Sequence, residues 1–275
     1  MRVAITGAGG FTGKILCEAL MSRGHQLTSI SLRDLTPDSG PDEHQAILSP
    51  IQQCDVLINA AAAKSIQSVQ DEFINSALPV ILAKLPSVSS GHTRFVHISS
   101  MNVAITELTD PYTRSKRKAE TGLTGLPVTI IRPGLIWSFS GGDAGQVVRI
   151  FQSKLPILPV PWPGNSYRPI MVEDFVSWIC HAVEDDLKPT IIEILGSTEL
   201  TMWDLLLDLS RRHDGRLLPV PTNWLPALIP PLKKLFFANS RLQQMMAFNR
   251  GVASPGVEQK VNLPFPDLST GLDDD

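Results

Sequence analysis

Short runs rich in apolar and β-branched residues alternate with helical stretches along the first half of the chain. The runs predict strands at residues 3–6, 27–32, 56–59, 95–99 and 128–131. Helical patterns lie between them at residues 12–23, 67–85 and 111–123. Strands that alternate with helices are typical of a parallel sheet covered on both faces. The pattern therefore predicts an α/β protein with a Rossmann-like, doubly wound parallel sheet.

The interval after the second predicted strand is short. Residues 34–55 would have to hold a helix, a strand and another helix, and prolines and glycines are scattered through them. We expect any strand in this interval to be brief or distorted.

The pattern changes after Pro133-Gly134, and we expect a smaller C-terminal lobe to begin there. Residues 138–168 are rich in Gly, Ser and Pro, with one helical pattern at 144–152. A helix from about Glu173 and a strand at 190–194 would return to the main sheet, whereas 200–250 reads as helical with a strand at 217–220. The expected main domain comprises residues 1–135 and about 170–196, and the lobe comprises about 136–169 and 197–275.

Composition excludes several classes of partner. The chain has 275 residues and a net charge of −3 with no long basic run, so neither nucleic acid nor an anionic membrane is an expected partner. Three well-separated cysteines in apolar stretches are typical of reduced thiols in a cytoplasmic protein. The first predicted strand begins at residue 3, so we expect no signal peptide. Prolines and lysines interrupt the longest apolar segment, residues 224–237, so we expect no membrane span.

The motif TGAGGFTG, Thr6 to Gly13, follows the first predicted strand and opens a helix. Gly7 would permit the tight turn, Gly10 a close approach to a pyrophosphate, and Gly13 close packing of helix on strand. The free N–H groups of the helix would face the phosphates. We expect a dinucleotide-binding turn, and the alternative is a purely structural glycine turn.

A second constellation suggests redox chemistry at a carbonyl group. Tyr112 and Lys116 are four residues apart on a predicted helix and so share a face. A nearby ammonium lowers the pKa of a phenol, which can then exchange a proton with a carbinol oxygen while hydride moves to or from a nicotinamide. Ser100 ends the strand just upstream and could bond the same oxygen.

These motifs resemble the extended short-chain dehydrogenase/reductases, the branch of NAD(P)-dependent sugar-nucleotide epimerases, dehydratases and reductases. The resemblance covers about residues 2–182 and includes DVLINAAA at 55–62, IRPG at 131–134 and RPIMVED at 168–174. Asn75 stands where the family usually carries an asparagine. INAAA followed by NSALPVILAK also resembles the 4-keto sugar reductases, although Met101-Asn102-Val103-Ala104 replaces their Asp-x-Val-Phe segment.

The resemblance implies roles for particular residues. The catalytic residues would be Ser100, Tyr112 and Lys116, and no metal site is expected. The cofactor-binding residues would be Gly7, Gly9, Gly10, Phe11, Thr12, Gly13, Arg33, Asn59, Ala60, Ala61, Lys116 and Pro133. The substrate-binding residues would be Ser100, Met101, Asn102 and Arg168, with the Arg168 guanidinium on a nucleotide diphosphate. The main domain would bind NAD(P), the lobe would bind substrate, and a homodimer would be common among such relatives.

The end of the second strand indicates which cofactor to expect. An acidic residue there favours NAD, whereas an arginine accommodates the 2′-phosphate of NADP. Ser31 stands near the position of the acid and Arg33 follows it, so NADP is expected, with NAD as the alternative. Arg33 could also be an ordinary solvated charge.

The combined prediction is a reductase of a keto group on a nucleotide-activated sugar. Dehydration is disfavoured because Met101 and Asn102 occupy the places of the acid pair that dehydratases use. The alternatives are a 4-epimerase with tightly bound NAD, a non-catalytic NAD(P)-binding sensor or scaffold, and a reductase of a ketone without a nucleotide. We expect His97 to be a core histidine, Arg168 to have Glu173 as an alternative partner, and residues 114–118 to form a solvated helix face apart from Lys116.

Overall fold

The computed structural model describes residues 1–139, 141–142, 157–160, 166–185, 187–212, 218–221 and 259–266. It divides into two compact units. The first unit consists chiefly of Met1–Pro133 and Glu173–Ile194, and the second chiefly of Gly134–Val172 and Leu195–Val252.

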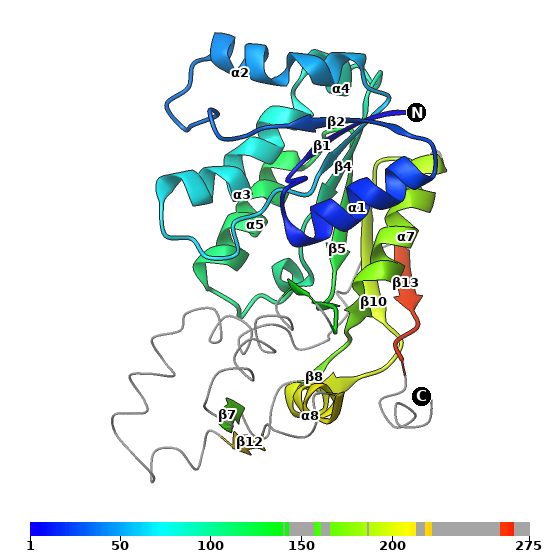
Figure 1. The fold of residues 1–275 in the computed structure, drawn as a ribbon. Coiled ribbons are helices and arrows are strands. Elements are labelled where there is room, and N and C mark those ends of the chain that lie inside the picture. The colour runs from blue at the N-terminus through cyan, green and yellow to red at the C-terminus, as the bar shows by residue number, and fades with distance from the viewer. Residues whose placement is uncertain are drawn as a thin grey trace. The chain divides into compact units, whose positions relative to one another are not determined.

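A seven-stranded sheet forms the first unit, with the strand order β13-β10-β5-β4-β3-β1-β2 (Figure 1). Neighbouring strands from β2 to β10 run parallel. This confirms the predicted Rossmann-like parallel sheet. The strands are β1 (Arg2–Thr6), β2 (Gln26–Ile30), β3 (Val56–Asn59), β4 (Arg94–Ile98), β5 (Val128–Pro133), β10 (Ile191–Gly196) and β13 (Gln259–Leu263).

Helices cover both faces of this sheet. Figure 1 shows α1 (Phe11–Ser22) and α7 (Val172–Glu184) on one face, and α3 (Val69–Ala83) and α5 (Pro111–Leu123) on the other. The helices α3 and α5 pack against each other, and a Cβ on Gly122 of α5 would lie 2.6 Å from Val80 of α3. The short helix α4 (Pro86–Ser89) precedes β4. The helical patterns in the sequence thus correspond to amphipathic layers on a buried sheet.

The expectation of a brief strand within residues 34–55 was wrong. This interval holds α2 (Pro41–Leu48) and the 3-10 helix η1 (Ser49–Gln53), so β2 is the edge strand. Pro41 at the first helical turn and Glu43, which accepts the Gly40 N–H at 3.2 Å, favour a helix start. Leu48 and Ile51 are fully buried in the hydrophobic core.

The described part of the second unit consists of short strand pairs and the helix α8 (Met202–Arg212). Its strands are β6 (Ile136–Trp137) with β9 (Ile170–Met171), β8 (Ser166–Tyr167) with β11 (Leu200–Thr201), and β7 (Ile157–Val160) with β12 (Leu218–Pro221). The helix α8 (Met202–Arg212) follows β11. The predicted helix at 144–152 and most of the predicted helical region up to residue 250 lie outside the described residues. Within the described ranges, no helix is long and apolar enough to cross a membrane.

Candidate functional site

The glycine turn has the geometry that a dinucleotide-binding turn needs. Gly7 has a φ of +78°, which an L side chain rarely adopts, and the Gly10 N–H donates to the Gly7 carbonyl at 3.0 Å. A Cβ on Gly13 would lie 2.1 Å from that same carbonyl oxygen, so only glycine fits. By contrast, a Cβ on Gly9 would meet nothing within 4 Å. The turn is therefore closely packed where Gly13 meets the Gly7 carbonyl, and it has free space beside Gly9.

The N-terminus of α1 is available to an anion. Its N-cap is Gly10, which has no side chain to accept the N–H groups of the first turn. Phe11, Thr12 and Gly13 form that turn, and Phe11 is 38% exposed. Unpaired N–H groups and the helix dipole favour phosphate at such an end.

The turn lies where the strand order reverses. β1 has β2 on one side and β3 on the other, and ligands of open parallel sheets bind at this switch point, beyond the carboxyl ends of the strands. The loop after β3 contacts the glycine turn, because a Cβ on Gly7 would lie 2.5 Å from the Ala61 nitrogen. The predicted residues Ala60 and Ala61 are thus brought to the glycine motif.

A row of buried polar side chains lies beneath this contact. Thr6 donates its hydroxyl to Asn59 Oδ1 at 2.6 Å, and Asn59 Nδ2 lies 3.1 Å from His97 Nδ1. The Ala61 N–H also donates to Asn59 Oδ1, at 3.3 Å. Burial, and after it the charge of Lys116, lowers the pKa of His97 well below its usual value. The imidazole is therefore neutral.

Two neighbouring serines at the end of β4 have different surroundings. The Ser99 hydroxyl donates to the buried carboxylate of Glu120. The Ser100 hydroxyl accepts the Asn102 N–H at 3.3 Å, at the start of the 3-10 helix η2 (Met101–Ala104). That bond uses an acceptor position, so Ser100 keeps its own proton to donate. The geometry favours Ser100 over Ser99 as the substrate-facing hydroxyl.

Tyr112 and Lys116 lie one turn apart on α5. Asp110 caps the helix by accepting the Thr113 N–H at 3.0 Å, which places half-buried Tyr112 in the first turn. Lys116 is 1% exposed, and its Nζ donates to the Ile98 carbonyl at 3.0 Å. Burial lowers the pKa of Lys116 to about 8. A buried lysine with a lowered pKa, held at the end of β4 close in sequence to Ser100, is typical of a reaction site.

Asn75 connects this helix pair to the loop after β3. Its side chain accepts the Ala63 N–H at 2.8 Å, and it donates to the Ala63 carbonyl at 2.7 Å and to Ser115 Oγ at 3.2 Å. The asparagine singled out in the sequence therefore fixes loop, α3 and α5 together.

Two groups of residues that support the site were missed at the sequence level. The first is a buried ion network. The Glu120 carboxylate on α5 accepts hydrogen bonds from two nitrogens of the Arg132 guanidinium, and a third Arg132 nitrogen lies 3.5 Å from the Glu193 carboxylate. It joins α5 to the ends of β4 and β5 through Ser99 and Arg132. The only signal in the sequence was the spacing of Glu120, one turn after Lys116.

The second is Arg117, which the sequence assigned wrongly to a solvated face. Its guanidinium donates to the carbonyls of Val103 and Leu108 at 3.3 Å and of Ile105 at 3.0 Å. These carbonyls belong to the segment between Ser100 and Tyr112. Arg117 therefore holds that segment in shape.

The remaining predicted residues are distributed as follows. Met101 and Asn102 are buried in η2, and buried Pro133 ends β5. Arg33 follows β2 with an exposed side chain. Arg168 belongs to the second unit, where it donates to Asn262 Oδ1 at 3.0 Å.

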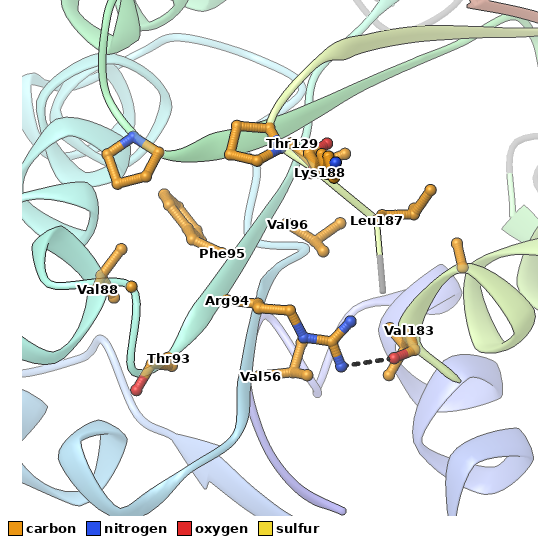
Figure 2. A pocket seen from close by; sticks show the side chains of 14 residues that line it. Val56, Val88, Thr93, Arg94, Phe95, Val96, Thr129, Val183, Leu187 and Lys188 are labelled. Carbon is orange, nitrogen blue, oxygen red and sulfur yellow. Dashed lines mark hydrogen bonds between the residues drawn. The ribbon is translucent and has the colours of Figure 1, made fainter. Parts of the chain in front are cut away.

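A pocket of about 210 Å³ lies at the opposite, amino-terminal ends of the strands (Figure 2). Val56 of β3, Phe95 of β4 and Val183 of α7 contribute to its largely apolar wall. Arg94 reaches across to the Val183 carbonyl at 2.8 Å and so caps the end of α7. None of the site residues predicted from the sequence lines this pocket.

The model of the NAD dependent epimerase/dehydratase family matches residues 3–194. The chain belongs to this family. The match spans the sheet from β1 almost to the end of β10 and includes the glycine turn, Ser100, Tyr112 and Lys116.

Individual relatives within and around this family are distant. A dTDP-4-dehydrorhamnose reductase from Mycolicibacterium smegmatis is 27% identical over 168 residues, which are 54% of this chain and 49% of the relative. A 3 beta-hydroxysteroid dehydrogenase/Delta 5-->4-isomerase from Mycobacterium tuberculosis is 26% identical over 236 residues, 68% of this chain and 62% of the relative. The chain thus spans only about half to three-fifths of the length of these curated relatives.

A solved structure shows the same fold. The dTDP-4-dehydrorhamnose reductase from Bacillus anthracis in complex with NADP has a TM-score of 0.66 and is 16% identical, over 80% of this chain and 83% of that one. At this identity the likeness supports the fold alone.

Proposed function

We propose that this protein is an NADPH-dependent oxidoreductase that reduces a keto group on a nucleotide-activated sugar. The observation that carries the proposal is the buried ammonium of Lys116, which lies one turn after Tyr112 and donates to the end of β4 beside Ser99-Ser100. A buried lysine has no structural need to be there, because an apolar side chain would fill the space at lower cost. Family membership and the distant dTDP-4-dehydrorhamnose reductase support the same reaction class.

The residues present fit a dinucleotide. Gly7 and Gly13 let the turn pack against the neighbouring backbone, where any Cβ would clash, Gly9 faces open space, and the first turn of α1 has no side-chain cap. These groups would hold the pyrophosphate, Ala60 and Ala61 would form the opposite wall, and Arg33 would meet a 2′-phosphate. Hydride transfer to the carbonyl carbon is the chemistry that NADPH supplies when bound.

The protein's own residues would manage the oxygen and its proton. Ser100 donates a hydrogen bond that orients the carbonyl, and Tyr112 delivers the proton to the developing alkoxide. Lys116 stabilises the phenolate that Tyr112 becomes, because an ammonium nearby favours the charged form of a phenol. Asn75 and Arg117 keep the helix and the preceding segment in place through the bonds described above.

Two other reactions use the same residues. A sugar-nucleotide 4-epimerase would retain NAD and recycle its hydride, and the matching family model includes epimerases. Reduction of a ketone that carries no nucleotide is favoured by the match to the hydroxysteroid dehydrogenase. In the nucleotide-sugar reaction, Arg168 would grip the diphosphate with its guanidinium.

The test begins with mass spectrometry of any nucleotide released on denaturation, followed by calorimetric titration with NADPH and NADH. Exchangeable NADPH together with turnover on a keto-sugar nucleotide supports the reductase, and Tyr112→Phe should then lose nearly all turnover at similar cofactor affinity. Retained NAD supports the epimerase. Binding of neither cofactor overturns the proposal.

Arg168→Ala separates the substrate classes. This variant should bind a nucleotide-sugar substrate much more weakly than the wild type, whereas its binding of a neutral ketone should hardly change. Lys260→Ala is a matched control, because it also removes an exposed cation close in sequence to Asn262, the partner of Arg168.

A further inference from the structure

Fully buried polar side chains on three neighbouring strands form one connected row. Thr6 on β1 pairs in register with Asn59 on β3, and Asn59 pairs in register with His97 on β4. None of the three is exposed to solvent. Burial of polar groups costs free energy that hydrogen bonds only partly return, so hydrophobic packing alone does not account for this row.

The direction of every bond in the row follows from one backbone group. The Ala61 N–H can only donate, so the oxygen of the Asn59 amide must face it, and the same oxygen accepts the Thr6 hydroxyl. The amide nitrogen therefore faces His97, whose Nδ1 must accept. The proton of the neutral imidazole must then sit on Nε2, which finds no hydrogen-bond partner among the residues that the structure describes.

The row cannot tolerate a second proton on His97. An imidazolium would present an N–H to the Asn59 NH₂ group, and two donors would then face each other. Burial and the nearby charge of Lys116 both disfavour that form. His97 is thus a permanent acceptor that fixes the rotation of the Asn59 amide.

The other end of the row lies at the cofactor side of the sheet. Asn59 Oδ1 holds the Ala61 N–H, and the Ala60 N–H donates to the Thr6 carbonyl at 3.1 Å. At the same place a Cβ on Gly7 would lie 2.5 Å from the Ala61 nitrogen. The row therefore sets how the backbone at Ala60 and Ala61 lies against the glycine turn.

We propose that His97 is a positioning residue for the dinucleotide: it fixes the Asn59 amide, which in turn holds the Ala60–Ala61 backbone as one wall of the crevice at Gly7. This role rests on the proposed cofactor binding. It differs from that of a core histidine, because loss of the Nδ1 acceptor displaces a backbone segment that follows the neighbouring strand β3, on the far side of Asn59.

Paired substitutions separate the acceptor from mere packing. His97→Leu removes the acceptor, whereas His97→Asn places an amide oxygen close to the position of Nδ1. Thr93→Val is the matched control, because Thr93 is also buried, immediately precedes β4, and donates to the Cys54 carbonyl at 2.9 Å at the opposite end of the sheet. Thr6→Val tests the same row from its other end if His97→Leu does not fold.

Two readouts are measured on each variant. Calorimetry gives the dissociation constant of NADPH, and hydrogen exchange gives the protection of the Ala61 amide. His97→Leu should raise the dissociation constant of NADPH about tenfold, which corresponds to the free energy of about one hydrogen bond. It should also speed hydrogen exchange at the Ala61 amide. His97→Asn and Thr93→Val should stay within about twofold of the wild type in both readouts.

The outcomes distinguish this proposal from the proposed function. Unchanged exchange at Ala61 in His97→Leu overturns the positioning role, as does equal weakening of NADPH in the Leu, Asn and Thr93→Val variants. Wild-type protein that binds neither NADPH nor NADH overturns the proposed function and the ligand named here. In that case the exchange measurement still decides whether His97 anchors Ala61.

Discussion

Replacing Lys116 with methionine should make the protein more stable and less active. The pKa of Lys116 is lowered from the ordinary 10.5 to about 8 because its ammonium is buried. At 1.36 kcal/mol for each pKa unit, holding that charge at pH 7 costs the fold about 3 kcal/mol. Methionine loses the bond from Nζ to the Ile98 carbonyl, which contributes about 1 kcal/mol, so Lys116→Met should gain about 2 kcal/mol in the free energy of unfolding.

This gain should depend on pH in a defined window. Between pH 8 and 10.5 the unfolded chain binds the lysine proton and the folded chain does not, so the stability of the wild type rises with pH there. The advantage of Lys116→Met should therefore be full below pH 8 and fade toward pH 10.5.

Urea titrations at pH 7, 8.5 and 10 measure this directly, with Lys118→Met as the control. Lys118 lies on the exposed side of α5 and pairs with Glu72, so its replacement should change stability little at any pH. A Lys116→Met protein that is less stable than the wild type at pH 7, or whose advantage does not change with pH, would refute the reasoning. Turnover in the reaction proposed above should fall in this variant at every pH.

Further predictions concern the glycine turn, the serines and the segment before α5. Gly13→Ala should abolish NADPH binding in calorimetry, because its Cβ would lie 2.1 Å from the Gly7 carbonyl, while Gly9→Ala, with nothing within 4 Å, should not destabilise the turn. Ser100→Ala should lower kcat at unchanged NADPH affinity; Ser99→Ala should instead lower the free energy of unfolding by about 1–3 kcal/mol, since it leaves a buried carboxylate short of a donor. Arg117→Met should speed hydrogen exchange in residues 103–108 and raise KM more than it lowers kcat, because three carbonyls lose their donor.

Local patterns were enough to predict the strands from β1 to β10 and the helices α1, α3, α5 and α7 of the first unit, but not α2, α4 or β13. The runs around residues 3–6 and 56–59 became β1 and β3 with the predicted bounds at their carboxyl ends. The glycine turn was equally readable, because the positive φ of Gly7 and the contact of Gly13 with the Gly7 carbonyl both arise within eight residues of chain. Tyr112 and Lys116 share a helix face for the same reason.

Only the tertiary structure decided which polar groups meet. Asn59 and His97 are 38 residues apart in the chain, and neither local sequence pattern predicts that their side chains form a hydrogen bond. Arg117 was misread because its helix neighbours Arg114 and Lys118 are indeed exposed, whereas the carbonyls it binds come from a segment without regular structure. The interval 34–55 shows the same limit: it was expected to hold a brief strand, whereas it forms helices that bury Leu48 and Ile51 in a core built from distant strands. The sequence by itself determined what depends on neighbours along the chain, and the fold decided burial and partner choice, because both depend on residues that only the packed sheet brings together.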